Sequence, residues 1–259
     1  MTEVTVPLVD HGRPTVAHGR QISPYRALTT KVWVPEAPGR RPLVVFVAGF
    51  EVGPTPYQAL LESWARRGYV VAAPELPLTD AAVAGANLDE GDLANQPADI
   101  RFVTDALVAQ GSPVARRIDR ARVAVTGHSD GAETALVDSI RPAPPGEPAY
   151  RAVIAISAQP LTGPASIPNP PMLVIQGSAD TINPPAHGYR LWEEAAPPKY
   201  FEVLYGAGHL PPLEAGSSWL PVVEAVTGAF LDAYVAGDAK PAGLALAGDA
   251  PPLASIYGA

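Results

Sequence analysis

Residues 122–136 read RVAVTGHSDGAETAL, and this stretch decides the fold. The valine-rich run up to Thr126 predicts a buried strand, and the run from Ala132 predicts the start of a helix. Between them, residues 127–131 match the pattern G-x-S-x-G, with Ser129 at its centre. Small residues around the serine suit a sharp turn, and the N-terminus of the following helix presents free N–H groups to an anion. The stretch therefore predicts a strand–turn–helix unit that carries a serine hydroxyl.

The rest of the chain alternates short apolar runs with longer amphipathic ones. Strands are predicted at 28–34, 43–47, 69–73, 153–157, 172–176 and 200–204, and helices at 55–68, 96–110, 185–195 and 219–235. Residues 80–95 are polar and rich in Gly and Ala, and a loop is predicted there. This alternation predicts an α/β fold in which helices cover both faces of a mostly parallel central sheet.

No linker interrupts the interior of the chain, so a single domain is predicted over residues 1–236. Residues 237–259 are rich in Ala, Gly and Pro. This composition predicts a C-terminal appendage that is laid on the surface or poorly ordered.

The composition excludes several classes of protein. With 47% hydrophobic and 17% charged residues, the 259-residue chain is not a disordered one. The absence of cysteine excludes disulfides, thiol nucleophiles and cysteine-based metal sites. The formal charge of −8 makes an electrostatic nucleic-acid partner unexpected. No apolar run approaches the length of a membrane span, and residues 1–20 hold no secretory leader. We therefore expect a cytoplasmic protein, unless Met1 is not the natural start.

A serine hydroxyl needs a base to act as a nucleophile, and the base is usually a histidine oriented by a carboxylate. Among the five histidines, His209 follows a predicted strand near the end of the chain, where the order Ser…Asp/Glu…His places the base. The alternative is that His209 is an ordinary surface-loop histidine. Two of the others, His11 and His18, precede the first predicted strand of the sheet. His128 lies inside the serine turn, and His187 lies in the first turn of a predicted helix.

Asp180 is the candidate carboxylate because it lies between Ser129 and His209 and follows the predicted strand 172–176. Glutamates inside predicted helices or strands fit this role less well: Glu193, Glu194 and Glu202. The alternative role for Asp180 is a turn or helix-capping aspartate.

An oxyanion hole requires two backbone donors, and one of them should be the N–H of Asp130, which follows the serine. The other should come from Phe50, after the predicted strand 43–47, and its ring would then also wall an acyl pocket. Alternatively, Phe50 is a loop anchor.

No cofactor or metal is expected, because the sequence holds no P-loop, no complete G-x-G-x-x-G and no H-E-x-x-H. Asp89, Glu90 and Asp92 are interpreted as a solvated loop rather than a cation site, since EF-hand spacing is absent.

Taken together, these stretches resemble the α/β-hydrolase superfamily. The resemblance is closest to its lid-less esterase branch, which contains cutinase-like polyester hydrolases, platelet-activating-factor acetylhydrolases, chlorophyllases and dienelactone-hydrolase-like proteins. Within that branch the chain is most similar to actinobacterial α/β-hydrolases. The matching stretches cover roughly residues 25–235 and are 42–50, 69–77, 95–99, 127–131, 176–185 and 206–212.

The resemblance implies a serine hydrolase that cleaves carboxylic esters with short-to-medium acyl groups, including bulky or polymeric ones. The catalytic residues would be Ser129, Asp180 and His209, with oxyanion donors from Phe50 and Asp130. Residues 157–171, where cap domains commonly enter this fold, are too few for a helical lid, so no cap domain is expected. The open cleft would be lined by Phe50, Gln159, Leu161, Ile182 and Leu210.

Three departures from the family pattern argue against plastic or cutin as the substrate. Ala48-Gly49 replaces the usual His-Gly, Asp130 replaces an apolar residue, and the secretion signal and C-terminal disulfide of polyester hydrolases are missing. Lactone, amide or dienelactone hydrolysis by the same triad remains an alternative, as does a non-catalytic ligand-binding protein with this fold. The sequence does not indicate the oligomeric state.

Overall fold

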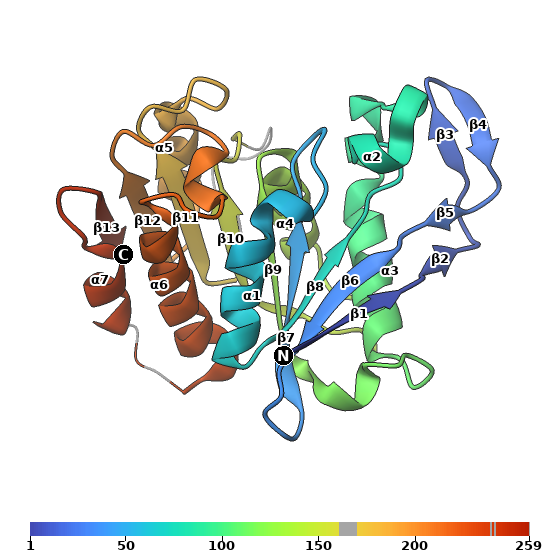
Figure 1. The fold of residues 1–259 in the computed structure, drawn as a ribbon, viewed down its shortest axis with the longest axis horizontal. Helices are drawn as coiled ribbons and strands as arrows, with labels where there is room; N and C mark the ends of the chain where they lie inside the picture. The colour runs from blue at the N-terminus through green and yellow to red at the C-terminus, as the bar shows by residue number, and fades with distance from the viewer. Residues whose placement is uncertain (161–169, 239, 241, 259) are drawn as a thin grey trace.

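A nine-stranded sheet runs through the computed structural model, which describes residues 1–160, 170–238, 240 and 242–258 (Figure 1). The strand order is β1–β6–β8–β7–β9–β10–β11–β12–β13. Neighbours from β8 to β12 pair in parallel: β8 (Val70–Pro74), β7 (Arg41–Val47), β9 (Ile118–His128), β10 (Tyr150–Ile156), β11 (Met172–Gly177) and β12 (Lys199–Leu204). Antiparallel pairs at the two edges add β1 (Thr2–Val6), β6 (Thr30–Val34) and β13 (Ala254–Gly258).

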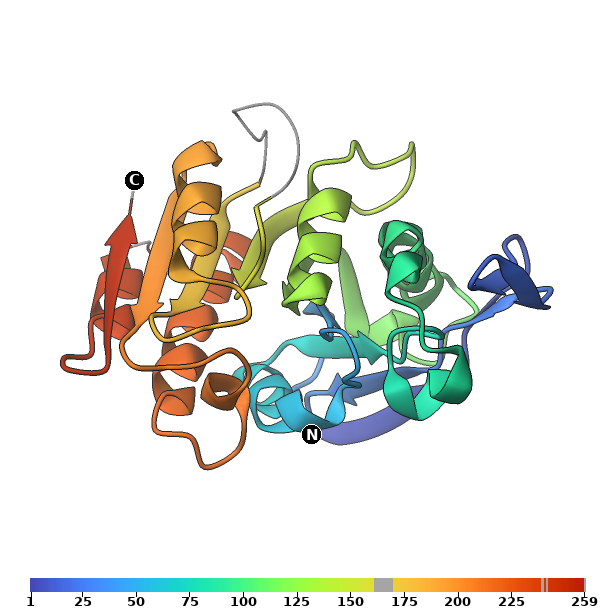
Figure 2. The same cartoon turned by 90° about the horizontal axis from the view of Figure 1, so that it is seen from above.

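Helices cover both faces of this sheet, and Figure 2 shows the two layers. One face packs against α3 (Gln96–Val108), α4 (Asp130–Ser139) and α5 (Pro185–Glu194). The other packs against α1 (Gln58–Arg67), which follows the 3-10 turn η1 (Thr55–Tyr57), and against α6 (Leu220–Leu231) and α7 (Ala242–Gly248). The run 43–47 is fully buried because both faces are covered. The predicted α/β fold is confirmed, and the described residues form no separate cap domain.

The segment 80–95 differs from the predicted loop. It forms α2 (Ala81–Ala84) and two 3-10 turns, η2 (Gly85–Asn87) and η3 (Glu90–Ala94). Asp80 accepts a hydrogen bond from the Ala82 N–H, and Asp89 accepts one from the Gly91 N–H. Aspartates at such positions satisfy the free N–H groups of a helix start. The polar residues of this segment therefore cap short helices, which are too short to show a periodic apolar pattern.

The C-terminal segment is not an appendage, which corrects the expectation for residues 237–259. Its helix α7 packs against α6, and its strand β13 pairs with β12 over five residues, from Tyr200↔Gly258 to Leu204↔Ala254. Leu244 is fully buried. Because a seven-residue helix and a five-residue strand carry little pattern, composition alone gave the wrong prediction. α6 continues into the π-helical turn η6 (Asp232–Ala236), from which this segment departs.

An N-terminal arm projects beside α2 (Figure 1). Its strands are β2 (Val9–Asp10), β3 (Thr15–Ala17), β4 (Arg20–Ser23) and β5 (Arg26–Ala27). Arg26 is 1% exposed and donates to both Asp92 and Asp99 over 2.5–3.0 Å. This buried ion pair attaches the arm to η3 and α3. Within the described chain, no helix has the length and apolar character needed to cross a membrane.

Candidate active site

Ser129 stands at the turn between β9 and α4, with the backbone angles φ 56° and ψ −128°. Such a conformation is strained for a residue with a side chain. A Cβ on Gly127 would overlap the carbonyl of Gly131, and a Cβ on Gly131 would overlap the carbonyl of Val47. The turn therefore needs both glycines of the G-x-S-x-G pattern. The Ser129 N–H donates to the Ile156 carbonyl over 2.9 Å, which fixes the turn against β10.

Asp180 follows β11 and receives four hydrogen bonds. Its Oδ1 accepts from the N–H groups of Ile182 and Asn183, each at 2.9 Å. Its Oδ2 accepts from Nδ1 of His209 at 2.8 Å and from the Gln176 amide at 3.2 Å. Burial by itself raises the pKa of Asp180, but the hydrogen bonds from His209 and the two N–H groups outweigh it and lower the pKa. Asp180 is therefore an ionised carboxylate.

His209 reaches Asp180 because the loops after β11 and β12 touch. The Ala179 N–H donates to the Ala207 carbonyl over 2.9 Å, and a Cβ on Gly177 would lie 2.5 Å from that same carbonyl oxygen. Since the ionised Asp180 can only accept, Nδ1 of His209 carries the proton of this bond, and in a neutral imidazole the lone pair is then on Nε2. This is the tautomer that a general base requires.

A chain of hydrogen bonds joins the loop after β7 to the His209 loop, and the sequence reasoning missed it. The Gly49 N–H donates to the Tyr57 hydroxyl over 3.3 Å, and that hydroxyl lies 2.9 Å from Nδ1 of His128. Nε2 of His128 lies 3.1 Å from the His209 carbonyl oxygen. Because that carbonyl only accepts, Nε2 of His128 carries the proton, and Tyr57 donates to Nδ1.

His128 must be neutral for this chain to exist. Burial, followed by the repulsion of His209, lowers the pKa of His128 to about 3. The ring centroids of His128 and His209 lie 4.5 Å apart, and His128 directly precedes Ser129. The same chain of bonds therefore sets the positions of the nucleophile turn and of the candidate base.

The loop after β7 also passes against Ser129. A Cβ on Gly49 would lie 3.2 Å from the Ser129 Cβ, so glycine favours this close approach. The next N–H along the chain belongs to Phe50. Neither it nor the Asp130 N–H has an acceptor in the part of the chain that the structure describes. Both N–H groups therefore lack a protein acceptor within the described residues.

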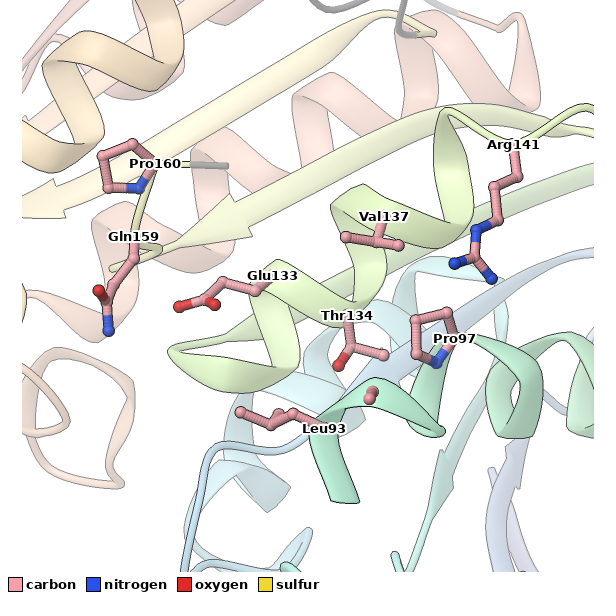
Figure 3. A pocket seen from close by; sticks show the side chains of 9 residues that line it. Leu93, Pro97, Glu133, Thr134, Val137, Arg141, Gln159 and Pro160 are labelled. Carbon is pink, nitrogen blue, oxygen red and sulfur yellow. The ribbon is translucent and has the colours of Figure 1, made fainter. Parts of the chain in front are cut away.

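The residues predicted to line the cleft do not all lie in one place. Phe50 and Leu210 are half-buried, and Ile182 is 67% exposed next to the Asp180 turn. Gln159 lines a cavity of about 490 Å³ along α4, together with Glu133 and not with the candidate triad (Figure 3). Leu161 lies outside the described residues.

Asp89 and Asp92, two of the three acidic residues considered for a cation site, are occupied by protein donors. Asp89 accepts from the His18 N–H at 2.6 Å, and Asp92 pairs with Arg26. Across the described ranges, no three His, Asp or Glu side chains gather closely enough to hold a metal ion.

A mostly parallel sheet with a serine turn after one strand, and with an aspartate and a histidine after two others, is the arrangement of the α/β-hydrolase fold. The family model named Chlorophyllase matches residues 8–184, and the chain belongs to that family. The matched region contains Ser129 and Asp180 and ends before His209.

A solved structure with a similar fold is the ferulic acid esterase from Streptomyces cinnamoneus. It is 20% identical in sequence, with a TM-score of 0.77 over 98% of this chain and 95% of that chain. The search of curated proteins found no match.

Proposed function

We propose that the protein is a serine esterase that hydrolyses carboxylic esters with short-to-medium acyl groups. The observation that carries the proposal is the 2.8 Å hydrogen bond between His209 Nδ1 and Asp180, with the His209 ring 4.5 Å from the ring of His128, which precedes Ser129. Membership of the Chlorophyllase family and a fold shared with a ferulic acid esterase support ester hydrolysis over a non-catalytic, ligand-binding role.

Acylation begins when His209 Nε2 takes the proton of the Ser129 hydroxyl. The serine oxygen bonds to the ester carbonyl carbon, and the carbonyl π electron pair moves to the carbonyl oxygen. The N–H groups of Phe50 and Asp130 donate hydrogen bonds to this negatively charged oxygen. Asp180 stabilises the positive charge that His209 then carries. When the tetrahedral intermediate collapses, His209 returns the proton to the departing alcohol, and an acyl-enzyme remains.

Deacylation repeats these steps with water. His209 takes a proton from the water molecule, whose oxygen bonds to the acyl carbon, and the oxyanion forms again beside Phe50 and Asp130. On collapse, the Ser129 oxygen leaves and recovers its proton from His209. The products are a carboxylic acid and the free enzyme.

The test compares the hydrolysis of p-nitrophenyl acetate and butyrate by the wild-type protein and by Ser129→Ala. We expect the substitution to lower the turnover by at least about 10³-fold, because the triad acts as a unit. Ser139→Ala, on the same helix, is the matched control and should keep the wild-type rate. A fluorophosphonate probe should add to Ser129, as mass spectrometry would detect. Equal rates for wild type and Ser129→Ala would refute the proposal.

A further inference from the structure

The cavity along α4 has no part in the mechanism proposed above. Glu133 and Val137 face it from α4, and Arg141 faces it from the chain just after α4 (Figure 3). Leu93 and Pro97 close it from η3 and α3, and Gln159 stands at its edge. Its walls combine apolar surface with a few polar groups, as small-molecule sites do.

One carboxylate oxygen in this cavity has no partner. Oε1 of Glu133 is buried and accepts no hydrogen bond from the residues that the structure describes. The neighbouring polar groups satisfy one another, since the Thr134 hydroxyl donates to Gln96 and the Gln96 amide donates to Thr79, each over 2.8 Å. None of these groups donates to Oε1 of Glu133, and a buried acceptor without a donor costs free energy.

The charges around Glu133 are also negative. Asp130, in the same first turn of α4, is 7% exposed, and its Oδ2 is a second buried oxygen without a partner. Burial, then the charges of Asp130 and Glu90, raise the pKa of Glu133 to about 7, against a hydrogen bond from the Gln159 N–H that lowers it. Burial and Glu90 likewise raise the pKa of Asp130. Arg141 also lines the cavity, beyond the end of α4, and among the described residues no ion pair joins it to Glu133.

We propose that Glu133 binds a primary ammonium group at the far end of the acyl chain of an ester substrate. An ammonium group has three N–H donors and a positive charge. One of its N–H groups can donate to Glu133 Oε1, and its positive charge is favoured by the acidic surroundings. The acyl chain is the relevant part of the ester because the acyl carbon bonds to Ser129, at the start of the same helix.

The distance sets the length of that chain. Glu133 follows Ser129 by four residues, and its N–H donates to the Ser129 carbonyl over 3.2 Å. Four residues of an α-helix rise by about 6 Å, which an extended acyl chain of about six carbons spans. This inference rests on the proposed esterase function and adds a substrate class to it.

The experiment measures kcat and KM at pH 8 for the p-nitrophenyl esters of hexanoate, 6-hydroxyhexanoate and 6-aminohexanoate, and for the p-nitrophenyl monoester of adipate. In the wild-type protein, we expect kcat/KM for the amino ester to exceed that for hexanoate by at least tenfold, mainly through a lower KM. In Glu133→Gln, this ratio should fall to about one. Glu3→Gln, an exposed glutamate on β1, should keep the wild-type ratio.

Three outcomes would overturn the inference: equal kcat/KM for the amino and hexanoate esters, a wild-type ratio in Glu133→Gln, or an equal preference for the hydroxy ester. A preference for the adipate ester would also overturn it, since Arg141 would then be the recognising group. The wild-type comparison does not depend on whether any variant folds.

Loss of hexanoate hydrolysis in Ser129→Ala tests the esterase proposal separately. If no ester is hydrolysed, calorimetric binding of 6-aminohexanamide to the wild-type protein still decides the role of Glu133. We expect its affinity to be at least tenfold weaker in Glu133→Gln, and absence of binding to the wild type would refute the ammonium site.

Discussion

At the scale of single residues, the site depends on groups that do no chemistry themselves. His128 directly precedes the candidate nucleophile, yet both of its ring nitrogens bond to the protein, one to Tyr57 and one to the His209 carbonyl. Its low pKa keeps it neutral at pH 7, so these bonds persist. His128 and Tyr57 are therefore positioning residues in the proposed mechanism.

Replacing Tyr57 by Phe should disturb both loops that His128 joins. The change leaves the Gly49 N–H and His128 Nδ1 without partners in a buried place, which should cost about 1–3 kcal/mol of unfolding free energy. We expect kcat to fall about tenfold with little change in KM, because the oxyanion donors and His209 move while the cleft remains. Urea unfolding and p-nitrophenyl butyrate kinetics measure the two effects.

The matched control is Tyr234→Phe, whose hydroxyl bonds to Tyr200 away from the site. It should leave kcat unchanged. If Tyr57→Phe lost stability but kept the wild-type kcat, the chain of bonds would have only a structural role.

At the scale of elements, the edge formed by β12, β13 and α7 holds a buried acid. Glu202 lies on β12 opposite Ile256 of β13, and Gly248 of α7 approaches so closely that a Cβ there would overlap the Glu202 carboxylate. Both carboxylate oxygens are buried without partners among the residues described here. Burial, and then the charge of Asp249, raise the pKa of Glu202 from 4.5 to about 8. Glu202 is therefore mostly protonated at neutral pH.

This raised pKa makes stability depend on pH. Because the folded state holds the proton more tightly than the unfolded state, the contribution of Glu202 is fully present below pH 4.5 and is lost as the pH rises through about 8. We expect Glu202→Gln to flatten the fall in unfolding free energy between about pH 5 and pH 8. Urea titrations across this range measure it. Glu3→Gln should keep the wild-type slope, and a wild-type slope in Glu202→Gln would contradict the assignment.

At the scale of the whole molecule, the N-terminal arm depends on the fully buried Arg26. Asp92 and Asp99 come from the segment that precedes α3 and from α3 itself, and both pair with this one guanidinium. Arg13 adds a second contact to Asp99 at 2.7 Å. The arm is thus attached to the main domain by charge pairs rather than by the sheet.

Replacing Arg26 by Met should destabilise the molecule by about 3–5 kcal/mol, because it keeps the volume but leaves buried aspartates without their partner. Chemical unfolding at pH 7 measures the loss. Arg66→Gln, which removes an exposed i,i+4 pair with Glu62, should change the stability by less than about 1 kcal/mol. Equal effects of the two substitutions would show that the buried pairs contribute no more than a surface pair.

The sequence by itself determined the α/β architecture, because runs such as 43–47 are continuously apolar and runs such as 96–110 carry a helical period. It also selected Ser129, Asp180 and His209 by chain order, and the structure pairs the last two at 2.8 Å. The short elements were not predicted from the sequence. The capped turns of 80–95 and the strand β13 are stabilised by contacts with distant residues, and not by a pattern in their own sequence.

Only the tertiary structure determined which distant residues form hydrogen bonds or ion pairs with one another. Tyr57 and His128 are 71 positions apart, and Arg26 and Asp99 are 73 positions apart, so no local pattern links them. The lack of a hydrogen-bond donor to Glu133 Oε1 is likewise recognised only once its surroundings are known. The physical reason is that hydrogen bonding and charge pairing act over a few ångströms, and only the packed chain brings distant residues that close.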